Sequence, residues 1–192
     1  IGAPGKASAG SVYLYSSSSS GLSAVPVTIR GSAVGCSSSF GRAVASAGNV
    51  NSSGRDDLLV GAPLCGTNSE GRAFLYTSFG SPPTWIFETN EDKANVGAAV
   101  AGLGDVSGDG IADFAVGGTA ADGGALDSGQ VYVFFGRSGV PSLTPADFLW
   151  TNRGDARFGA SIAGGRDWDS DGLMDIVVGA PGWSDNTTIP NK

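Results

Sequence analysis

The segment that decides the fold runs from residue 158 to residue 181. It opens with a Phe-Gly pair, continues into a nine-residue acidic loop and ends on a Gly-Ala-Pro signature. These parts are Phe158-Gly159, Asp167-Trp168-Asp169-Ser170-Asp171-Gly172-Leu173-Met174-Asp175 and Gly179-Ala180-Pro181. Earlier counterparts are Phe40-Gly41 with Gly61-Ala62-Pro63, Val96-Gly97 with Gly117-Gly118-Thr119, and a lone Gly2-Ala3-Pro4. A repeat of about sixty residues indicates a stacked or radial array of similar units.

Each repeat contains four short strand-like segments, and none has a helical period. The first is rich in Gly and Ala, the second is a short apolar run, the third alternates with aromatic residues, and the fourth is less regular. In that order they are 40–47, 96–103 and 158–163; 58–60, 114–116 and 176–178; 10–15, 71–76 and 129–134; and 25–30, 84–87 and 148–151. The pattern predicts an all-β fold built from β-propeller blades of four antiparallel strands.

The strands amount to about three blades, whereas a propeller ring needs about four to eight. One chain therefore leaves the ring incomplete. We expect a single repeat array in which 1–31 holds the last two strands of a first blade, 32–90 a second blade, 91–152 a third, and 153–192 the first two strands of a fourth. The remaining blades would come from the same longer polypeptide or from another copy whose strands complete the two half-blades.

Two loops between the first and second strands carry oxygen side chains at loop positions 1, 3, 5 and 9, with Gly at position 6. Calcium takes about 6–8 oxygen ligands, and the backbone carbonyl of position 7 can add one. Carboxylates this close repel one another unless a cation lies among them. The metal-free alternative is a pair of acidic turns. We predict two Ca²⁺ sites, formed by Asp105, Ser107, Asp109, Ile111 and Asp113, and by Asp167, Asp169, Asp171, Leu173 and Asp175.

Neither loop is an EF-hand, because Val116 and Val178 stand at position 12, where that motif needs Glu. The corresponding loop of the earlier repeat has lost most of its charge, and Arg55 has entered it. We expect that third loop to be a weak or vestigial metal site made of Asn49, Asn51, Ser53 and Asp57.

The composition excludes several classes of function. The net charge is −7, and the acidity of the two loops accounts for it, which argues against a nucleic-acid partner. The chain has no His and no Gly-x-Ser-x-Gly elbow, so we expect no enzyme activity. No apolar run reaches the ~18 residues of a membrane span. The chain opens without a leader, so any export signal lies outside it.

Cys36 lies in the loop before the first strand of the second blade, and Cys65 lies in the loop after the second strand of the same blade. Because adjacent strands run in opposite directions, both loops emerge on one face, and we predict a Cys36–Cys65 disulfide typical of an extracellular protein. The alternative is two free thiols in a cytosolic protein. Asn51 and Asn186 open N-glycosylation sequons. Trp183 either contacts a ligand or packs on the neighbouring blade.

Taken together, the Phe-Gly pair, the DxDxDGxxD-type loop and Gly-Ala-Pro resemble the FG-GAP repeat of integrin α-subunit propellers and related extracellular proteins. The resemblance covers nearly the whole chain, with departures at Val96-Gly97 and Gly117-Gly118-Thr119. It implies calcium loops on the lower face and ligands or partner subunits on the opposite face, but it carries over no ligand-contact residue.

The favoured interpretation is a calcium-stabilised, secreted or cell-surface adhesion module that binds a protein or glycan. The alternative is a structural building block of an extracellular matrix or surface appendage, assembled by strand exchange.

Overall fold

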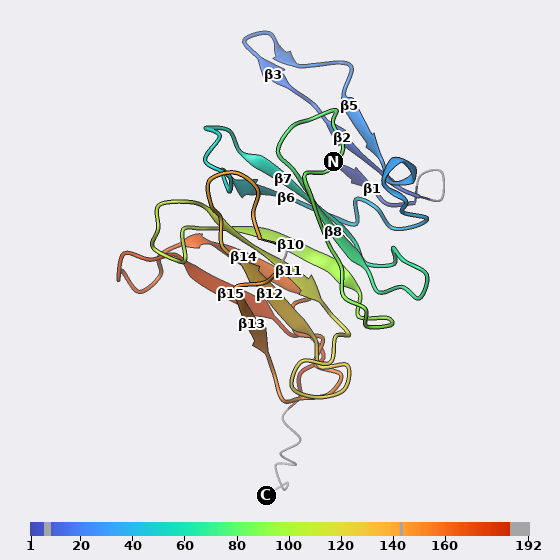
Figure 1. The fold of residues 1–192 in the computed structure, drawn as a ribbon, viewed down its shortest axis with the longest axis vertical. Helices are drawn as coiled ribbons and strands as arrows, with labels where there is room; N and C mark the ends of the chain where they lie inside the picture. Colours follow the sequence, from blue (N-terminus) through green and yellow to red (C-terminus); the bar gives the residue numbers. More distant parts are fainter. Residues whose placement is uncertain (6–8, 143, 185–192) are drawn as a thin grey trace, which may run out of the picture.

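A computed structural model of the chain describes residues 1–5, 9–142 and 144–184. Two complete four-stranded antiparallel sheets form its centre (Figure 1). In each sheet, strands that follow one another in sequence are neighbours. The strands are β6 (Ala43–Gly48), β7 (Asp57–Ala62), β8 (Arg72–Tyr76) and β9 (Trp85–Phe87), then β10 (Val96–Gly104), β11 (Asp113–Gly118), β12 (Gln130–Phe134) and β13 (Asp147–Trp150).

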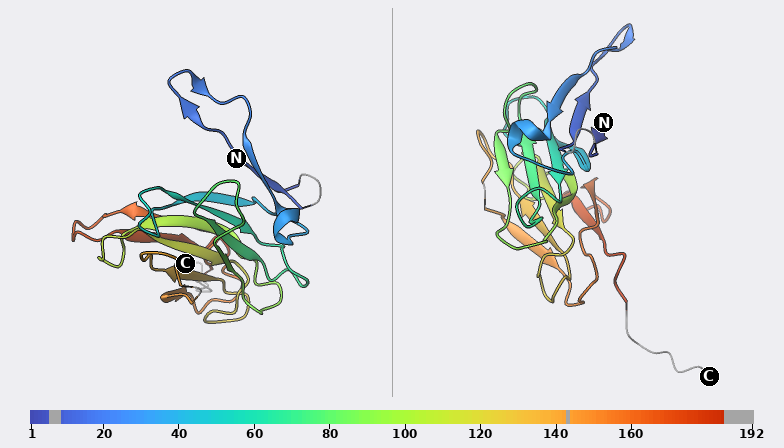
Figure 2. Two further views of the ribbon diagram at one scale, coloured as in Figure 1. Left: turned by 45° about the horizontal axis from the view of Figure 1, so that its top comes forward. Right: turned by 90° about the vertical axis from the view of Figure 1, so that its right-hand side faces the viewer.

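Smaller sheets flank this centre. On one side is a three-stranded sheet of β1 (Gly2–Ala3), β2 (Ser11–Leu14) and β5 (Val27–Arg30). On the other side is a two-stranded sheet of β14 (Ser161–Arg166) and β15 (Asp175–Gly179). The hairpin of β3 (Ser17–Ser18) and β4 (Gly21–Leu22) projects from the body as an arm, and a short 3-10 helix, η1, covers Gly31–Val34 (Figure 2). The predicted fold class is confirmed: the described residues are all-β, with four-stranded antiparallel blades and no closed ring.

Two first strands begin later than the sequence pattern suggests. The pattern places them from Phe40 and Phe158, whereas β6 starts at Ala43 and β14 at Ser161. The intervening residues form a tight turn, in which the Arg42 N–H donates to the Ser39 carbonyl and the Ala160 N–H to the Arg157 carbonyl. All three repeats share this turn, with positive φ angles of 58°, 57° and 54° at Ser39, Asn95 and Arg157. The strand β10 begins earlier, at Val96, because Val96 also pairs with Gly118 across a register shift.

An aromatic cluster joins the two complete sheets. The Trp85 ring from β9 is almost fully buried, and its centroid lies 5.3 Å from that of Phe114 and 4.8 Å from that of Phe134 in the next sheet. Its Nε1–H donates to the Ser142 carbonyl at 3.0 Å. Burial of this kind is the main stabilising contribution where one sheet packs on another. The cluster thus fixes how one blade sits against the next.

Glycines of the repeated signatures meet between neighbouring blades. A β-carbon on Gly117 of the third blade would collide with the carbonyl oxygen of Gly159, which belongs to the following Phe-Gly pair. Gly159 itself has a φ of +86°, in the left-handed region that side chains disfavour. The spacing between the Phe-Gly and Gly-Ala-Pro motifs is therefore a packing requirement of adjacent blades.

Candidate metal centres

Three carboxylates gather in the loop between β14 and β15. One oxygen from each of Asp167, Asp169 and Asp175 lies within 4.8 Å of the other two. All are hard oxygen donors, the type that Ca²⁺ prefers. Asp169 is exposed, whereas Asp167 and Asp175 are half-buried. This donor set fits a calcium ion, and it lies where the sequence predicts one.

Backbone N–H groups hold the first aspartate of each acidic loop. Asp167 Oδ1 accepts from Ser170 at 2.6 Å, and Oδ2 accepts from Gly172 at 2.9 Å. In the loop between β10 and β11, Asp105 Oδ1 accepts from Gly108 and Oδ2 from Gly110, both at 2.7 Å. The Gly110 hydrogen bond is the largest influence lowering the pKa of Asp105, because it stabilises the ionised form. Both loops are thus shaped around a carboxylate at position 1.

The ninth residue of each loop is also the first residue of the following strand. Asp175 Oδ2 accepts from the Trp168 N–H at 2.7 Å, and Asp113 Oδ2 accepts from the Val106 N–H at 2.9 Å. Asp113 is fully buried, and its Oδ1 accepts from the Gly136 N–H at 2.8 Å. Burial outweighs these hydrogen bonds and raises the pKa of Asp113. A bound dication would favour the ionised form.

The remaining predicted ligands take matching places in the two loops. Asp109 Oδ1 and Asp171 Oδ1 each accept the N–H of loop position 7, from Ile111 and Leu173, at 2.8 Å. At position 3 of the earlier loop, Ser107 Oγ donates to Asp105 Oδ1 at 3.3 Å. Among the described residues, a carboxylate trio forms only in the later loop. The loop at 105–113 has the same frame, but its position 3 is Ser107, whereas the later loop has Asp169 there.

The loop between β6 and β7 has the same turn with amides in place of carboxylates. Asn49 Oδ1 and Asn51 Oδ1 both accept the Ser53 N–H at 2.9 Å. The Asp57 carboxyl is buried, with Oδ2 accepting from Val50 at 3.1 Å and Oδ1 lacking a hydrogen bond within the described chain. Burial raises the pKa of Asp57. The weak or vestigial metal loop stays a prediction.

All three loops lie at one end of the molecule (Figure 1). They also pack on one another: a β-carbon on Gly48 would lie 2.7 Å from the Ala112 side chain, and one on Gly108 would lie 3.2 Å from Leu173. Gly136, which donates to Asp113, is followed by Arg137. The Arg137 N–H donates to the Val50 carbonyl at 3.0 Å. The three loops therefore pack into one continuous surface, and its acidic part is formed by the two later loops.

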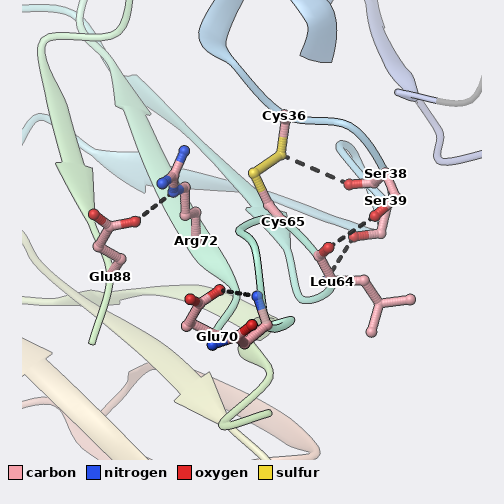
Figure 3. Close-up of a disulfide and its surroundings, with 9 residues drawn as sticks. Cys36, Ser38, Ser39, Leu64, Cys65, Glu70, Arg72 and Glu88 are labelled. Atoms are coloured by element: carbon pink, nitrogen blue, oxygen red, sulfur yellow. Dashed lines mark hydrogen bonds and ion pairs between the residues drawn. A yellow bond between two sulfur atoms is a disulfide. The ribbon is translucent and has the colours of Figure 1, made fainter. Parts of the chain in front are cut away.

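The opposite end carries the disulfide. Cys36 and Cys65 are bonded, as predicted, with their Cα atoms 5.2 Å apart (Figure 3). Two hydrogen bonds of 2.8 Å reinforce the link: Ser38 Oγ donates to the Leu64 carbonyl, and Ser39 Oγ accepts the Leu64 N–H. The segment entering the second blade is thus fixed to the loop that follows β7.

Trp183 lies on the same end, next to the turn that precedes β14. Its ring is about half exposed, with 49% of the residue accessible, and the Arg153 guanidinium carbon lies 5.8 Å from the ring centroid. The adjacent Gly182 N–H donates to the Ala156 carbonyl at 3.0 Å. Of the two sequons, Asn51 is half-buried in the loop described above, and Asn186 lies outside the described residues.

Sequence reasoning missed an open cavity of about 610 Å³ at this end. The residues that line it come from equivalent positions of successive blades. They include the residue after each Phe-Gly or Val-Gly pair and the third residue of each complete signature, namely Arg42, Ala98, Ala160, Pro63, Thr119 and Pro181. Superimposing the repeats by their motifs would have brought these positions together.

The fold and the loops define an FG-GAP repeat protein of the β-propeller class. The FG-GAP repeat family model matches residues 158–189, and the chain belongs to this group and resembles the propeller of integrin α subunits. It is 36% identical to integrin alpha-5 of Xenopus laevis over 157 residues, which are 74% of this chain and 15% of that protein. It is 37% identical to integrin alpha-IIb of Homo sapiens, with the same coverage of each chain.

Integrin alpha-4 of Xenopus laevis is 34% identical over 191 residues, which are 93% of this chain and 18% of that protein. The chain therefore spans less than a fifth of the length of these relatives. Within the described ranges, we find no helix with the length and apolar character needed to cross a membrane.

Proposed function

We propose that the chain is a calcium-stabilised extracellular propeller module that binds a protein or glycan through the end opposite the acidic loops. The observation that carries the proposal is the carboxylate trio of Asp167, Asp169 and Asp175, whose oxygens converge within 4.8 Å. Calcium would occupy this site and the loop at 105–113. It would stabilise the fold by neutralising the acidic end, with no part in a chemical reaction.

The ligand face would be the end that carries the disulfide, the open cavity and Trp183. Loops positioned by a rigid scaffold are where binding residues concentrate. A half-exposed Trp beside a cation is suited to stacking on a sugar or a partner side chain. The Cys36–Cys65 disulfide supports an oxidising, extracellular location. Asn51 and Asn186 would be glycan acceptors in a eukaryotic host.

Binding of the purified chain to immobilised matrix proteins and glycans tests this proposal. We expect binding in calcium that EDTA reverses, and a weaker signal for Trp183→Ala. Trp150→Ala is the matched control, because Trp150 is about equally exposed but stands on β13, the outer strand of the third blade, and does not line the cavity. A failure of every extracellular ligand to bind, in calcium and without it, would contradict the proposal.

A structural role is the second candidate, and the free edge of β15 favours it. Within the described chain β15 pairs only with β14. An apolar groove lined by Phe148, Trp150, Phe158, Ile176 and Val178 runs beside it. Unpaired edges of this kind accept a further strand. Ordered self-association that grows with concentration in light scattering, without any foreign ligand, would favour this candidate over adhesion.

A further inference from the structure

A segment of the third blade crosses onto the second blade at the end that carries the acidic loops. It comprises residues 136–142, which follow β12, and we call it the strap. The Arg137 N–H donates to the Val50 carbonyl at 3.0 Å, and the Gly139 N–H donates to the Asn51 carbonyl at 3.1 Å. The strap therefore holds the loop between β6 and β7, which has few acidic side chains, through main-chain hydrogen bonds.

The first residue of the strap is bound to the neighbouring acidic loop. The Gly136 N–H donates to Asp113 Oδ1 at 2.8 Å, and both residues are buried. Asp113 is the ninth residue of its loop and a predicted calcium ligand. Its Oδ2 accepts the N–H groups of Val106 and Ser107, each at 2.9 Å. One carboxylate oxygen is thus held by its own loop and the other by the strap.

The contact at Gly136 depends on the absence of a side chain. A β-carbon there would lie 2.2 Å from the Ala112 carbonyl oxygen and 3.0 Å from the Val50 carbonyl oxygen. The φ of Gly136 lies outside the left-handed region, so the close approach, and not the backbone conformation, is what calls for glycine. Gly136 is therefore the point at which the strap meets both loops.

The second blade shows the same position without glycine. The strand register makes Ser78 the counterpart of Gly136, and Asp57 the counterpart of Asp113. Asp57 Oδ1 is buried and has no hydrogen-bond partner within the described chain. A residue with a β-carbon could not approach its loop as closely as Gly136 does. The hydrogen bond to the ninth carboxylate is thus missing in the loop that has also lost most of its acidic ligands.

We propose that Gly136 is a positioning residue for calcium in the loop at 105–113, and that the strap transmits occupancy of this site to the loop at 49–57. With an ion bound, the Asp113 carboxylate would be fixed, and with it the strap N–H groups that hold the earlier loop. Hydrogen bonds to metal ligands orient them and affect metal affinity. Such coupling is reciprocal, so loosening the strap must weaken calcium binding. This inference rests on the proposed calcium binding and goes beyond it.

Calcium titrations of the 192-residue chain and its Gly136→Ala variant, followed by calorimetry and ¹⁵N nuclear magnetic resonance, test the positioning role. The amide signals of Gly110 and Gly172 follow the two predicted sites separately. Gly136→Ala should weaken binding at the Gly110 site about tenfold. Affinity at the Gly172 site should not change, and its retention shows that the variant is folded. Ser138→Ala is the matched control, because Ser138 is exposed in the same strap, and it should change neither site.

Hydrogen exchange in the parent chain tests the transmission without any variant. The amides of Arg137 and Gly139 should exchange more slowly in calcium than in EDTA, because the strap is then fixed at Asp113. The slowing should exceed that of the β8 amides, which report overall stability. Trp85 offers a second signal: its Nε1–H donates to the carbonyl of Ser142 at the far end of the strap, and its indole resonance should shift in the same titration.

Three results would overturn this inference alone, since the parent chain would still bind calcium. They are an equal loss of affinity at both sites in Gly136→Ala, which a merely structural role would produce, unchanged affinity at both sites, and strap exchange that calcium does not slow. A parent chain that binds no calcium would overturn the proposed function, and this inference with it.

Discussion

Gly61 and Gly97 meet backbone to backbone at the boundary between the two complete blades. A β-carbon on Gly61 would collide with the Gly97 carbonyl oxygen, and one on Gly97 would lie 2.9 Å from the Ala62 nitrogen. Gly97 also has a φ of +84°. The glycine of one signature thus fits against the glycine of the next, and this pair explains why both motifs contain glycine.

Gly97→Ala should destabilise the fold far more than Gly80→Ala. Both glycines have a φ of +84°, but a β-carbon on Gly80 would meet nothing within 4 Å. Gly80→Ala should lower the free energy of unfolding by about 1–2 kcal/mol, the cost of the left-handed conformation alone. Gly97→Ala should cost at least about 2 kcal/mol more because of the clash. Urea unfolding of both variants measures this, and equal costs would refute the packing argument.

Trp85→Ala should remove much of the contact between the two complete blades. Trp85 is 2% exposed and packs on Phe114 and Phe134, so we expect a loss of about 3–5 kcal/mol in unfolding free energy. Trp150, which is 52% exposed, provides the control, and Trp150→Ala should cost less than about 1 kcal/mol. A similar denaturant midpoint for both variants would argue against the described interface.

Loss of the disulfide should destabilise the chain without abolishing calcium binding. The bond joins residues 29 apart in sequence, and a closed loop of that size is worth about 3–4 kcal/mol in the chain-entropy account. Replacing Cys36 and Cys65 together by Ala should lower the denaturant midpoint by the corresponding amount. The acidic loops lie at the other end, so the calcium affinity that we predict for them should not change when it is measured by calorimetry.

Glu91 makes stability depend on pH in a predictable direction. Burial, with the nearby charges of Asp122 and Asp127, raises its pKa, although its Oε1 accepts the Asp122 N–H at 2.6 Å. The folded state therefore holds the proton more tightly than the unfolded state does. The stabilising effect of that proton is complete below the ordinary pKa of about 4.3 and is lost as pH rises through the raised value.

Glu91→Gln should remove this dependence, since Gln can still accept the Asp122 N–H. Relative to the parent in EDTA, the variant should gain stability as pH rises from about 4 and level off above the raised pKa. Denaturant unfolding at several pH values checks the difference between the two proteins. A difference that stays constant with pH would show that the pKa of Glu91 is ordinary.

Periodicity and motif spacing predicted the blades well, because alternation and turn residues act locally. The strand pattern at 71–76 became β8, and the expected ninth ligands Asp113 and Asp175 start β11 and β15. Contacts between repeats were beyond local reasoning. The hydrogen bond from Gly136 to Asp113 and the burial of Trp85 beneath Ser142 depend on how whole blades pack. The cavity at Arg42 and Arg157 arises from the same packing.

Calcium stoichiometry tests the central claim most directly. Isothermal titration of the metal-free chain should show two Ca²⁺ ions bound, with one lost in Asp105→Asn and the other in Asp167→Asn. Asn49→Ala should leave the count unchanged if the first loop is vestigial. Binding of no calcium, together with a melting curve that EDTA does not alter, would contradict the account.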